Sequence, residues 1–507
     1  MNLLTDAWLP VRKIEGGTIN WISLSDLLTG QGQYEICLPR DDLEMAALQL
    51  VICIIQVLFT PKDLRELLGN LRAPMSEQKY LEGIKDYKEW FSVDHPEYPF
   101  MQVRGVKANL ETPMAKLMAG LTGATSSCFV NEPGQADRLC AGCAAIALFN
   151  QAANAPSFGG GFKAGLRGSA PITTLIQGRH LRETVWLNIL DSMQLEATIP
   201  GCYDNWHQPP TWVQSIEEKS SIQTSSIGLL RGLLWQPANI ELCSPASQGD
   251  CCCCGRKKVP VYEVFLKAKF NYTLNGLWPY PHSPRMLNFK NNTSEEKFAS
   301  FTTSAPTWTR LAGFVVQKEV NQNQKEGHQP AAVVLQARKL FSKQPARMRL
   351  AVGGYRNNQA SVIERRHEHF DLNKGWHQHP NLINEFVELG LGHKSALRKS
   401  LYVFYKGMKE VKGAGVAVQE LGEVQFYRRT DSLMQKTLAE ANFYDPEQLA
   451  HDKDILRSAL KQHCLQIFQE QVSPYLHDPE LIRTMAVARR TLNKHLDDLK
   501  PESKGGE

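Results

Sequence analysis

The chain has 507 residues, of which 42% are hydrophobic and 21% charged, and its formal net charge is +5. Its length predicts two or three domains, and its composition excludes a disordered or fibrous protein. Because the net charge is modest, any nucleic-acid surface must be a local concentration of Lys and Arg.

The start of the chain, "MNLLTDAWLP", lacks the basic residues and the long apolar run of a secretory signal. Twelve cysteines in such a chain indicate free thiols or a metal site, because disulfides rarely persist in a reducing cytosol. We therefore expect a cytoplasmic protein.

The most apolar stretch is "MAALQLVICIIQVLF", residues 45–59. It is shorter than the roughly 20 residues that a helix needs to cross a bilayer, and Gln49 and Gln56 interrupt it. It predicts a buried helix, capped by Asp41 or Asp42, and no membrane contact.

Two cysteine pairs have the spacing of metal ligands. Cys140 and Cys143 in "LCAGC" form one pair, and Cys251 and Cys254 in "GDCCCCGRKK" form the other. Four thiolates make a closed tetrahedral zinc site, which would be structural because it leaves no position for water. The alternatives are that the cysteines bind no metal, or that Cys252 or Cys253 replaces an outer ligand.

The segment "SFGGGFKAGLRG", residues 157–168, places three glycines before Lys163 and Arg167. It lacks the ending of a phosphate-binding Walker loop and most of a dinucleotide fingerprint. Three glycines leave a bare main chain that can approach a narrow groove, such as the minor groove of DNA, while Lys163 and Arg167 hold flanking phosphates. A glycine turn with solvated cations is the alternative.

The chain up to about residue 365 has the short β-rich runs and turn signals of an irregular mixed α/β domain. Predicted strands lie in 262–274, 331–337 and 349–355. "GGYRNNQAS", residues 353–361, is typical of a turn, and its amides could bind base edges.

"ERRHEHF", residues 364–370, suggests a metal site through His367 and His369. On a helix, these two side chains would point to different sides. We therefore expect a basic surface where the chain enters the next domain. No spacing in the sequence indicates a catalytic triad or a two-metal nuclease site.

Residues 366–500 have the apolar periodicity of a four-helix bundle, and 501–507 form a tail. In the last helix, Asp478 and Pro479 supply the N-cap and the first helical position. Cations of the bundle form either a solvated face or a track for a DNA backbone. They are Arg398, Lys399, Arg428, Arg429, Arg483, Arg490 and Lys494.

Several long motifs are similar to those of one family, and they occur in the same order from residue 1 to about residue 500. They include "LPRDDLEMAAL", "CFVNEPGQ", "FGGGFKAGLRG", "IGLLRGLLWQPA", "NGLWPYPHSP" and "GGYRNNQAS". In these motifs the chain resembles the large subunit of the type I-E CRISPR Cascade complex, also called CasA. The resemblance implies an α+β domain followed by a four-helix bundle. It also implies a non-catalytic protein that reads the protospacer-adjacent motif of double-stranded DNA from the minor groove and helps open the strands.

The resemblance also assigns residues and partners. The DNA-reading residues would be Gly159, Gly160, Gly161, Lys269, Asn358, Gln359 and Ala360, with Gln359 as a wedge. A loop at Phe129, Val130 and Asn131 would contact the guide RNA. The zinc ligands would be Cys140, Cys143, Cys251 and Cys254. Partners would be the guide RNA, target DNA, other Cascade subunits and a helicase-nuclease recruited in trans. The rival functions are a metal-dependent nuclease and an RNA or protein scaffold.

Overall fold

Two units divide the chain in the computed structural model, which describes residues 1–121, 134–245, 247–343 and 346–500. Unit 1 comprises Met1–Thr303, Gln317–Leu340 and Arg349–His369, and unit 2 comprises Ser304–Val316, Phe341–Met348 and Phe370–Glu507. The boundary predicted at residue 365 lies close to His369, but sequence analysis did not foresee that two earlier segments join unit 2. The predicted guide-RNA loop at 129–131 and the predicted tail lie outside the described residues.

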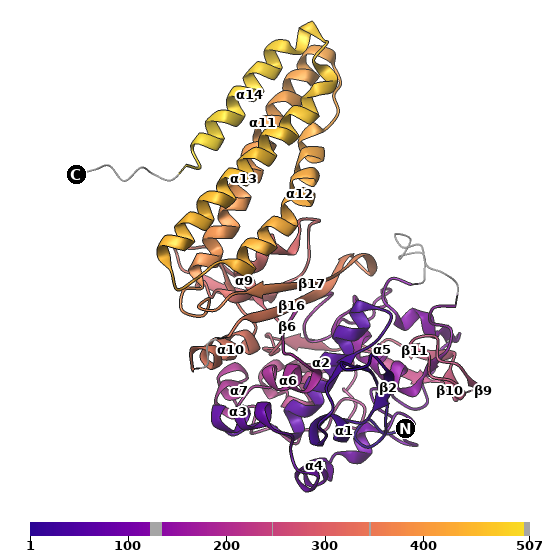
Figure 1. Ribbon diagram of the computed structural model, residues 1–507. Helices are drawn as coiled ribbons and strands as arrows, with labels where there is room; N and C mark the ends of the chain where they lie inside the picture. Colours follow the sequence, from indigo (N-terminus) through magenta and orange to yellow (C-terminus); the bar gives the residue numbers. More distant parts are fainter. Residues whose placement is uncertain (122–133, 246, 344–345, 501–507) are drawn as a thin grey trace. The chain divides into compact units, whose positions relative to one another are not determined.

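Helix α2 (Asp41–Leu58) lies in the core of unit 1 and packs against α5 (Ala141–Ala153) (Figure 1). The predicted buried helix is thus confirmed, because the residues from Leu43 to Val57 are buried apart from Glu44. The predicted cap is wrong. Arg40 occupies the N-cap position, while Asp41 and Asp42 lie in the first turn, where the positive end of the helix dipole favours carboxylates. Among the described residues, no helix has the length and apolarity of a membrane span.

The strands of unit 1 form small sheets rather than one large sheet. Four three-stranded sheets have the orders β2-β1-β3, β5-β10-β9, β4-β11-β8 and β14-β13-β15, a fifth has the order β17-β16-β6, and β12 pairs with β7. The strand bounds are β1 Leu9–Lys13, β2 Ile19–Ile22, β3 Tyr34–Ile36, β4 Thr112–Pro113, β5 Leu139–Cys140, β6 Thr173–Gln177, β7 Ser221–Gln223, β8 Asn239–Leu242, β9 Ser247–Gly249, β10 Val259–Tyr262, β11 Val264–Ala268, β12 Thr273–Asn275, β13 Arg285–Lys290, β14 Thr293–Phe298, β15 Glu326–Gln329, β16 Met348–Asn358 and β17 Ser361–Leu372.

Short helices surround these sheets. They are α1 Leu24–Thr29, α3 Leu64–Arg72, α4 Glu77–Ile84, α6 Leu181–Leu187, α7 Ser192–Thr198, α8 Leu229–Leu233 and α10 Ala332–Lys343, while α9 Leu311–Val315 belongs to unit 2. Helix α10 corrects the strand predicted at 331–337. A short apolar run does not distinguish strand from helix by itself, and here Val333, Ala337 and Leu340 are buried at helical spacing.

The segment from 353 to 370 also differs from its prediction. Residues 353–358 belong to β16 and only Gln359 and Ala360 form the turn, so the predicted turn is much shorter. Residues 364–370, treated as helical, lie in β17 instead. Pairing with β16 overrides the local helical preference of the charged residues. The two strands therefore form a hairpin with a two-residue tip.

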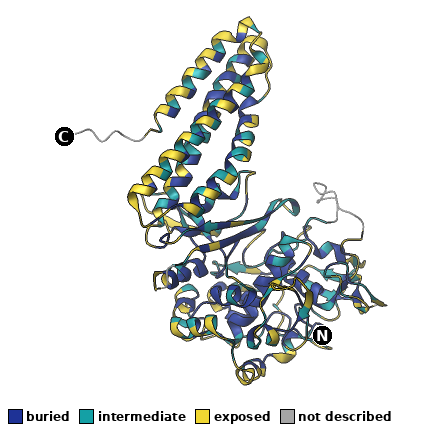
Figure 2. Ribbon diagram, viewed as in Figure 1, coloured by how far each residue is buried: buried dark blue, intermediate teal, exposed yellow. Residues whose placement is uncertain are grey.

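Four long helices form the C-terminal part of unit 2, as predicted. They are α11 Asn381–Lys412, α12 Val418–Glu440, α13 Pro446–Val472 and α14 Ile482–Asp497. The buried residues face inward and the exposed ones outward (Figure 2). Asp478 caps a short 3-10 turn, Pro479–Leu481, that leads into α14, so the predicted start signal lies one turn before α14, whose own N-cap is Leu481.

Candidate nucleic-acid interface and metal site

Three glycines form an exposed loop a few residues after α5. Gly159, Gly160 and Gly161 have φ angles of +77°, +57° and +89°, a region that glycine adopts without steric cost. A Cβ built on Gly160 would meet no atom within 4 Å, and Gly160 and Gly161 are exposed. This glycine loop therefore presents bare main chain to its surroundings.

Lys269 and the tip of the β16–β17 hairpin lie against the glycine loop. Lys269 Nζ donates to the carbonyl oxygen of Gly160 at 3.0 Å, and a Cβ on Gly159 would lie 3.0 Å from the Cβ of Ala360. Gln359, at the tip, is exposed and has a φ of +53°, which costs free energy in a residue other than glycine. Three segments far apart in the sequence thus meet at one place on the surface of unit 1.

Two phenylalanines and a second lysine support the base of the glycine loop. The rings of Phe158 and Phe162 pack edge to face with centroids 5.4 Å apart. Lys267 Nζ lies 5.5 Å from the first centroid and 5.1 Å from the second, within the range of cation–π attraction. Sequence analysis missed Lys267, which lies on β11, two residues before Lys269.

Arg167 is buried, so its guanidinium is not exposed to a phosphate in the way that the sequence analysis predicts. It is only 3% exposed, and its guanidinium donates to the carbonyl oxygen of Ala153 at 2.8 Å, to Thr173 Oγ1 at 2.9 Å, and to Asn154 Oδ1. Burial lowers the pKa of Arg167 to about 10. The guanidinium fixes the chain between α5 and β6, whereas Lys163 remains half-exposed.

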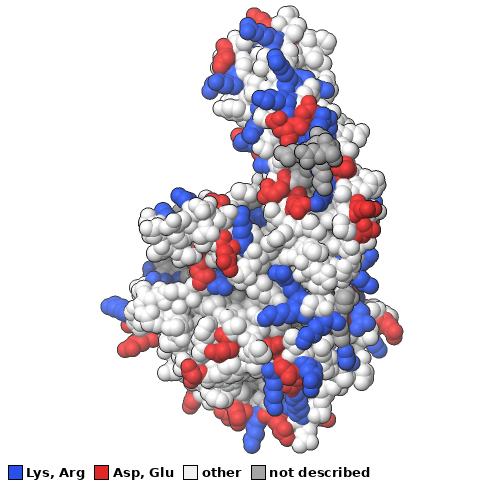
Figure 3. Space-filling view, turned by 90° about the vertical axis from the view of Figure 1, so that its left-hand side faces the viewer, with Lys and Arg blue, Asp and Glu red and all other residues white. Residues whose placement is uncertain are grey.

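The predicted bundle cations differ in their surroundings. Arg398 pairs with Glu423 at 2.7 Å, and Arg429 pairs with Glu470 at 2.6 Å. The exposed ones are Arg398, Lys399, Arg428, Arg483, Arg490 and Lys494. Over the helical unit, Lys and Arg are interspersed with Asp and Glu on the face drawn in Figure 3. Their contact with a DNA backbone stays a prediction.

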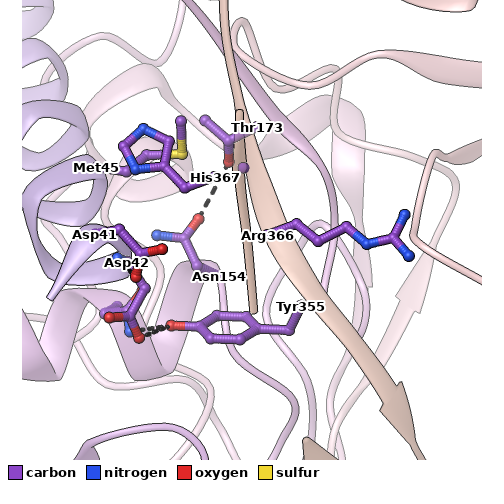
Figure 4. A pocket seen from close by; sticks show the side chains of 11 residues that line it. Asp41, Asp42, Met45, Asn154, Thr173, Tyr355, Arg366 and His367 are labelled. Atoms are coloured by element: carbon purple, nitrogen blue, oxygen red, sulfur yellow. Dashed lines mark hydrogen bonds between the residues drawn. The ribbon is translucent and has the colours of Figure 1, made fainter. Parts of the chain in front are cut away.

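The root of the β16–β17 hairpin is joined to α2 and α5 by buried polar contacts. Tyr355 donates from its hydroxyl to Asp42 Oδ2 at 2.7 Å and accepts from Asn150 Nδ2 at 2.7 Å. The contact between Tyr355 and Asp42 is drawn in Figure 4, where the side chains surround a small cavity. Sequence analysis did not identify these residues, because their contacts depend on the tertiary fold.

Four cysteines come together where β5, the start of α5 and the 251–254 turn meet. The sulfur atoms of Cys140, Cys143, Cys251 and Cys254 all lie within 4.8 Å of one another, and the sulfurs of Cys140 and Cys254 are 3.7 Å apart. Four sulfurs bound tetrahedrally to zinc would be about 3.8 Å apart. The set therefore fits a metal ion. Of the four consecutive cysteines at 251–254, the two outer ones, Cys251 and Cys254, belong to the cluster.

Neighbouring donors favour thiolates at two of the four cysteines, Cys251 and Cys254. Trp21 Nε1 donates to the sulfur of Cys254 at 3.3 Å, and the main-chain nitrogen of Cys140 donates to the sulfur of Cys251 at 3.3 Å. Hydrogen bonding with Cys140 lowers the pKa of Cys254 to about 7 and that of Cys251 below the usual range, while it raises the pKa of Cys143. Cys140 is the N-cap of α5. The hydrogen bond with Cys143 lowers its pKa, but those with Cys251 and Cys254, together with burial, outweigh it and raise the pKa of Cys140.

His367 and His369 lie on one face of β17 rather than on two sides of a helix, and their ring centroids are 5.0 Å apart. Burial lowers the pKa of His367. Within the described residues, the cysteine cluster is the only group of three or more potential ligands that lie close enough to hold a metal.

Comparison with known proteins identifies related chains. A family model described as CRISPR-associated protein Cse1 matches residues 2–467. The solved CasA (Cse1) of Thermus thermophilus is 16% identical over 98% of this chain and 99% of its own, with a TM-score of 0.71. Cse1 of Thermobifida fusca is 16% identical over 98% of both chains, with a TM-score of 0.75. A chain of a structure entitled "CRISPR RNA-guided surveillance complex" is 14% identical over 97% of this chain and 99% of its own, with a TM-score of 0.66.

The fold class predicted from the sequence is confirmed by these matches. A mixed α/β fold with small sheets and a C-terminal helical region is common to this chain and the Cse1 structures. Because the structural neighbours share less than a fifth of their residues with this chain, they establish the fold and not the roles of single residues.

The buried position of Arg167 leads to a prediction about stability. Arg167→Lys should lower the free energy of unfolding by about 2–4 kcal/mol, because a lysine cannot satisfy the acceptors around the guanidinium. Lys163→Met, a control at a half-exposed position, should change it by less than about 0.5 kcal/mol. Urea unfolding followed by tryptophan fluorescence measures both. Equal stability of the two variants would show that Arg167 is not a structural residue.

Proposed function

The chain belongs to the CRISPR-associated Cse1 family, and we propose that it is the large subunit of an RNA-guided surveillance complex of the Cascade type. In this proposal it reads the protospacer-adjacent motif of double-stranded DNA from the minor groove and starts R-loop formation by separating the adjacent base pairs. Guide RNA pairing then supplies the sequence specificity. Cleavage is left to a helicase-nuclease recruited in trans.

The observation that carries this proposal is the meeting of the glycine loop, Lys269 and the hairpin tip. The loop offers main-chain groups without side chains, Lys269 supplies a cation held at 3.0 Å from Gly160, and Gln359 projects from the tip beside them. A reader of the minor groove needs these three properties in one place. The groove is narrow, its base edges present mainly acceptors, and its walls are phosphates.

The hairpin tip supports the wedge role of Gln359. Its left-handed backbone is held by the side chain of Asn357, which donates to the carbonyl oxygen of Gln359 at 2.5 Å and to Ser169 Oγ at 3.2 Å. A strained and exposed residue that the neighbouring structure holds in place is typical of a functional position. Insertion between base pairs costs a few kcal/mol per step, and new protein contacts offset that cost.

The partners in this proposal are the guide RNA, the other Cascade subunits and the target DNA. Neighbouring structures are CRISPR RNA-guided surveillance complexes, including one in a pre-nicking state. The loop proposed to contact the guide RNA is Phe129, Val130 and Asn131, which lies outside the described residues.

We further propose that the four cysteines hold one structural zinc ion. Four thiolates leave no open position on the metal, so zinc would join the 251–254 turn to the start of α5 and supply no chemistry. The donors from Trp21 and from the main chain of Cys140 would orient the ligands and offset their charge.

The zinc proposal predicts unequal roles for adjacent cysteines. Cys251→Ser should reduce the bound metal from about one ion per chain to nearly none and lower the thermal midpoint, since metal binding stabilises the folded state. Cys252→Ser, the matched control, should keep the metal, because Cys252 is not in the cluster. Elemental analysis and thermal unfolding measure both effects. Retention of the metal in Cys251→Ser would contradict the assignment.

The glycine loop predicts a loss of motif reading when a side chain is added. Gly160→Ala should weaken motif-dependent binding of DNA by the assembled complex about tenfold, because the new methyl group would stand on the face of the loop. Gly105→Ala is the control: Gly105 also has a left-handed backbone, with φ of +73°, and a Cβ there meets nothing within 4 Å. Its affinity should stay within about twofold of the wild type. If Gly160→Ala bound motif DNA as tightly as Gly105→Ala does, and kept the same preference for motif over non-motif DNA, the groove role would be ruled out.

The wedge predicts a kinetic effect. Gln359→Ala should slow strand opening about tenfold while leaving the initial capture of duplex nearly unchanged, because capture precedes insertion. Asn292→Ala, at the tip of the β13–β14 hairpin, removes an amide from another left-handed residue, with φ of +58°, and should affect neither step. A fluorescent base analogue beside the motif reports opening. If Gln359→Ala reduced capture and opening equally, the wedge assignment would be wrong.

A further inference from the structure

A wedge can separate base pairs only if its root resists displacement. The stacking energy that Gln359 must overcome acts back on the β16–β17 hairpin, whose tip is two exposed or half-exposed residues. If the root yielded, the tip would move away from the base pairs instead of entering between them. The contacts at the root must therefore hold the hairpin against that force.

One face of the root is held by a charged network that is almost fully buried. Tyr355 lies three residues before Asn358 and is 1% exposed. Its hydroxyl donates to Asp42 Oδ2 at 2.7 Å. Arg40 donates to both carboxylate oxygens of Asp42, at 2.9 and 2.6 Å, and also to the carbonyl oxygen of Ala119 at 2.8 Å. Burial opposes ionisation of Asp42, but the hydrogen bonds from Arg40 outweigh it and keep the pKa of Asp42 below its ordinary value.

The other face of the root has an independent clamp between the two strands. Arg356 on β16 donates to Glu364 Oε2 on β17 at 2.8 Å. Arg366 donates to Glu364 Oε1 at 2.8 Å and to the carbonyl oxygen of Thr303 at 2.9 Å. Figure 4 shows Arg366 extending away from Asp42, so the two sets of contacts are separate.

Two glycines let the root lie close to its supports. A Cβ on Gly353 would be 2.3 Å from the sulfur of Met45, and a Cβ on Gly354 would be 3.0 Å from the carbonyl oxygen of Pro171. Both distances are shorter than ordinary van der Waals contact. Strand β16 therefore approaches the side chain of Met45 on α2 and the main chain at Pro171, before β6, with no side chain of its own at these two positions.

We propose that Tyr355 and Asp42 are positioning residues for strand separation, acting through the hairpin without touching DNA. This inference rests on the proposed wedge role of Gln359. A hydrogen bond to a buried carboxylate is among the stronger side-chain contacts, and Tyr355 is the residue of β16 that makes it. Loss of this contact loosens the root while leaving the glycine loop and Lys269, which capture the duplex, in place.

The test uses the complex assembled with guide RNA and partner subunits. Tyr355→Phe removes one hydroxyl, and strand opening beside the motif should become about tenfold slower while the affinity for duplex in the capture step stays within about twofold. On a target whose first base pairs beside the motif are mismatched, Tyr355→Phe should open at the wild-type rate, because no wedge is then needed. Arg356→Met, which breaks the clamp on the opposite face, should give the same pattern.

Tyr280→Phe is the matched control. Its hydroxyl is also buried and donates to the carbonyl oxygen of Leu233 at 3.0 Å, so its loss should reduce stability without slowing strand opening. If Gln359→Ala slows opening but Tyr355→Phe and Arg356→Met do not, the inference is overturned and the wedge stands. If none of the three slows opening, the proposed wedge itself fails. A rate on mismatched DNA as slow as that on paired DNA would also overturn the inference.

Discussion

The hydrogen bond between Asn150 on α5 and Tyr355 on β16 joins the two elements on which the candidate site depends. Helix α5 begins at the cysteine cluster, where Cys140 is its N-cap. At its other end, the carbonyl oxygen of Ala153 accepts from Arg167, which fixes the chain that continues from the glycine loop. One buried helix thus connects the cysteine cluster, the hairpin root and the glycine loop. The position of each depends on how α5 packs against α2.

The electrostatics of the site follow from this arrangement. With a net charge of only +5, the chain cannot rely on a general positive surface. Lys267 of β11 and Lys269 just after it lie beside the glycine loop instead; the carbonyl of Gly160 holds Lys269, and two phenylalanine rings hold Lys267. Arg167 has a different role despite its place in the glycine-rich motif, since its guanidinium is buried among neutral acceptors. The buried cation, Arg167, therefore stabilises the fold, whereas the two lysines beside the glycine loop are the cations available to a ligand.

Much of the fold could be predicted from local signals. The period of Leu456, Leu460, Cys464 and Ile467 identified a bundle helix, because burial on one side of a helix repeats every three or four residues. The paired spacing identified the four cysteines that lie together in the structure, since spacing is a local property. The glycines predicted a loop of bare main chain for the same reason, and their φ angles in the structure are positive. Each of these signals needs only a few neighbouring residues.

The predictions failed where partners distant in the sequence decide the outcome. His367 and His369 were treated as helical, but pairing with β16 makes their segment a strand. The local sequence predicts a phosphate contact for Arg167. It does not show that the guanidinium is already bonded to acceptors from other segments, such as Thr173 and Ser283. The local sequence predicts Asp42 as a possible helix cap. In the structure it contacts Tyr355 and Arg365, which follow more than three hundred residues later. No local pattern contains that information.

A structure of the assembled complex bound to duplex DNA that carries the adjacent motif is the most direct measurement of the central claim. The account predicts main-chain atoms of Gly159–Gly161 within hydrogen-bonding distance of base edges in the minor groove, and Gln359 between the base pairs beside the motif. A glycine loop that faces solvent, with the DNA on another surface of the chain, would contradict it.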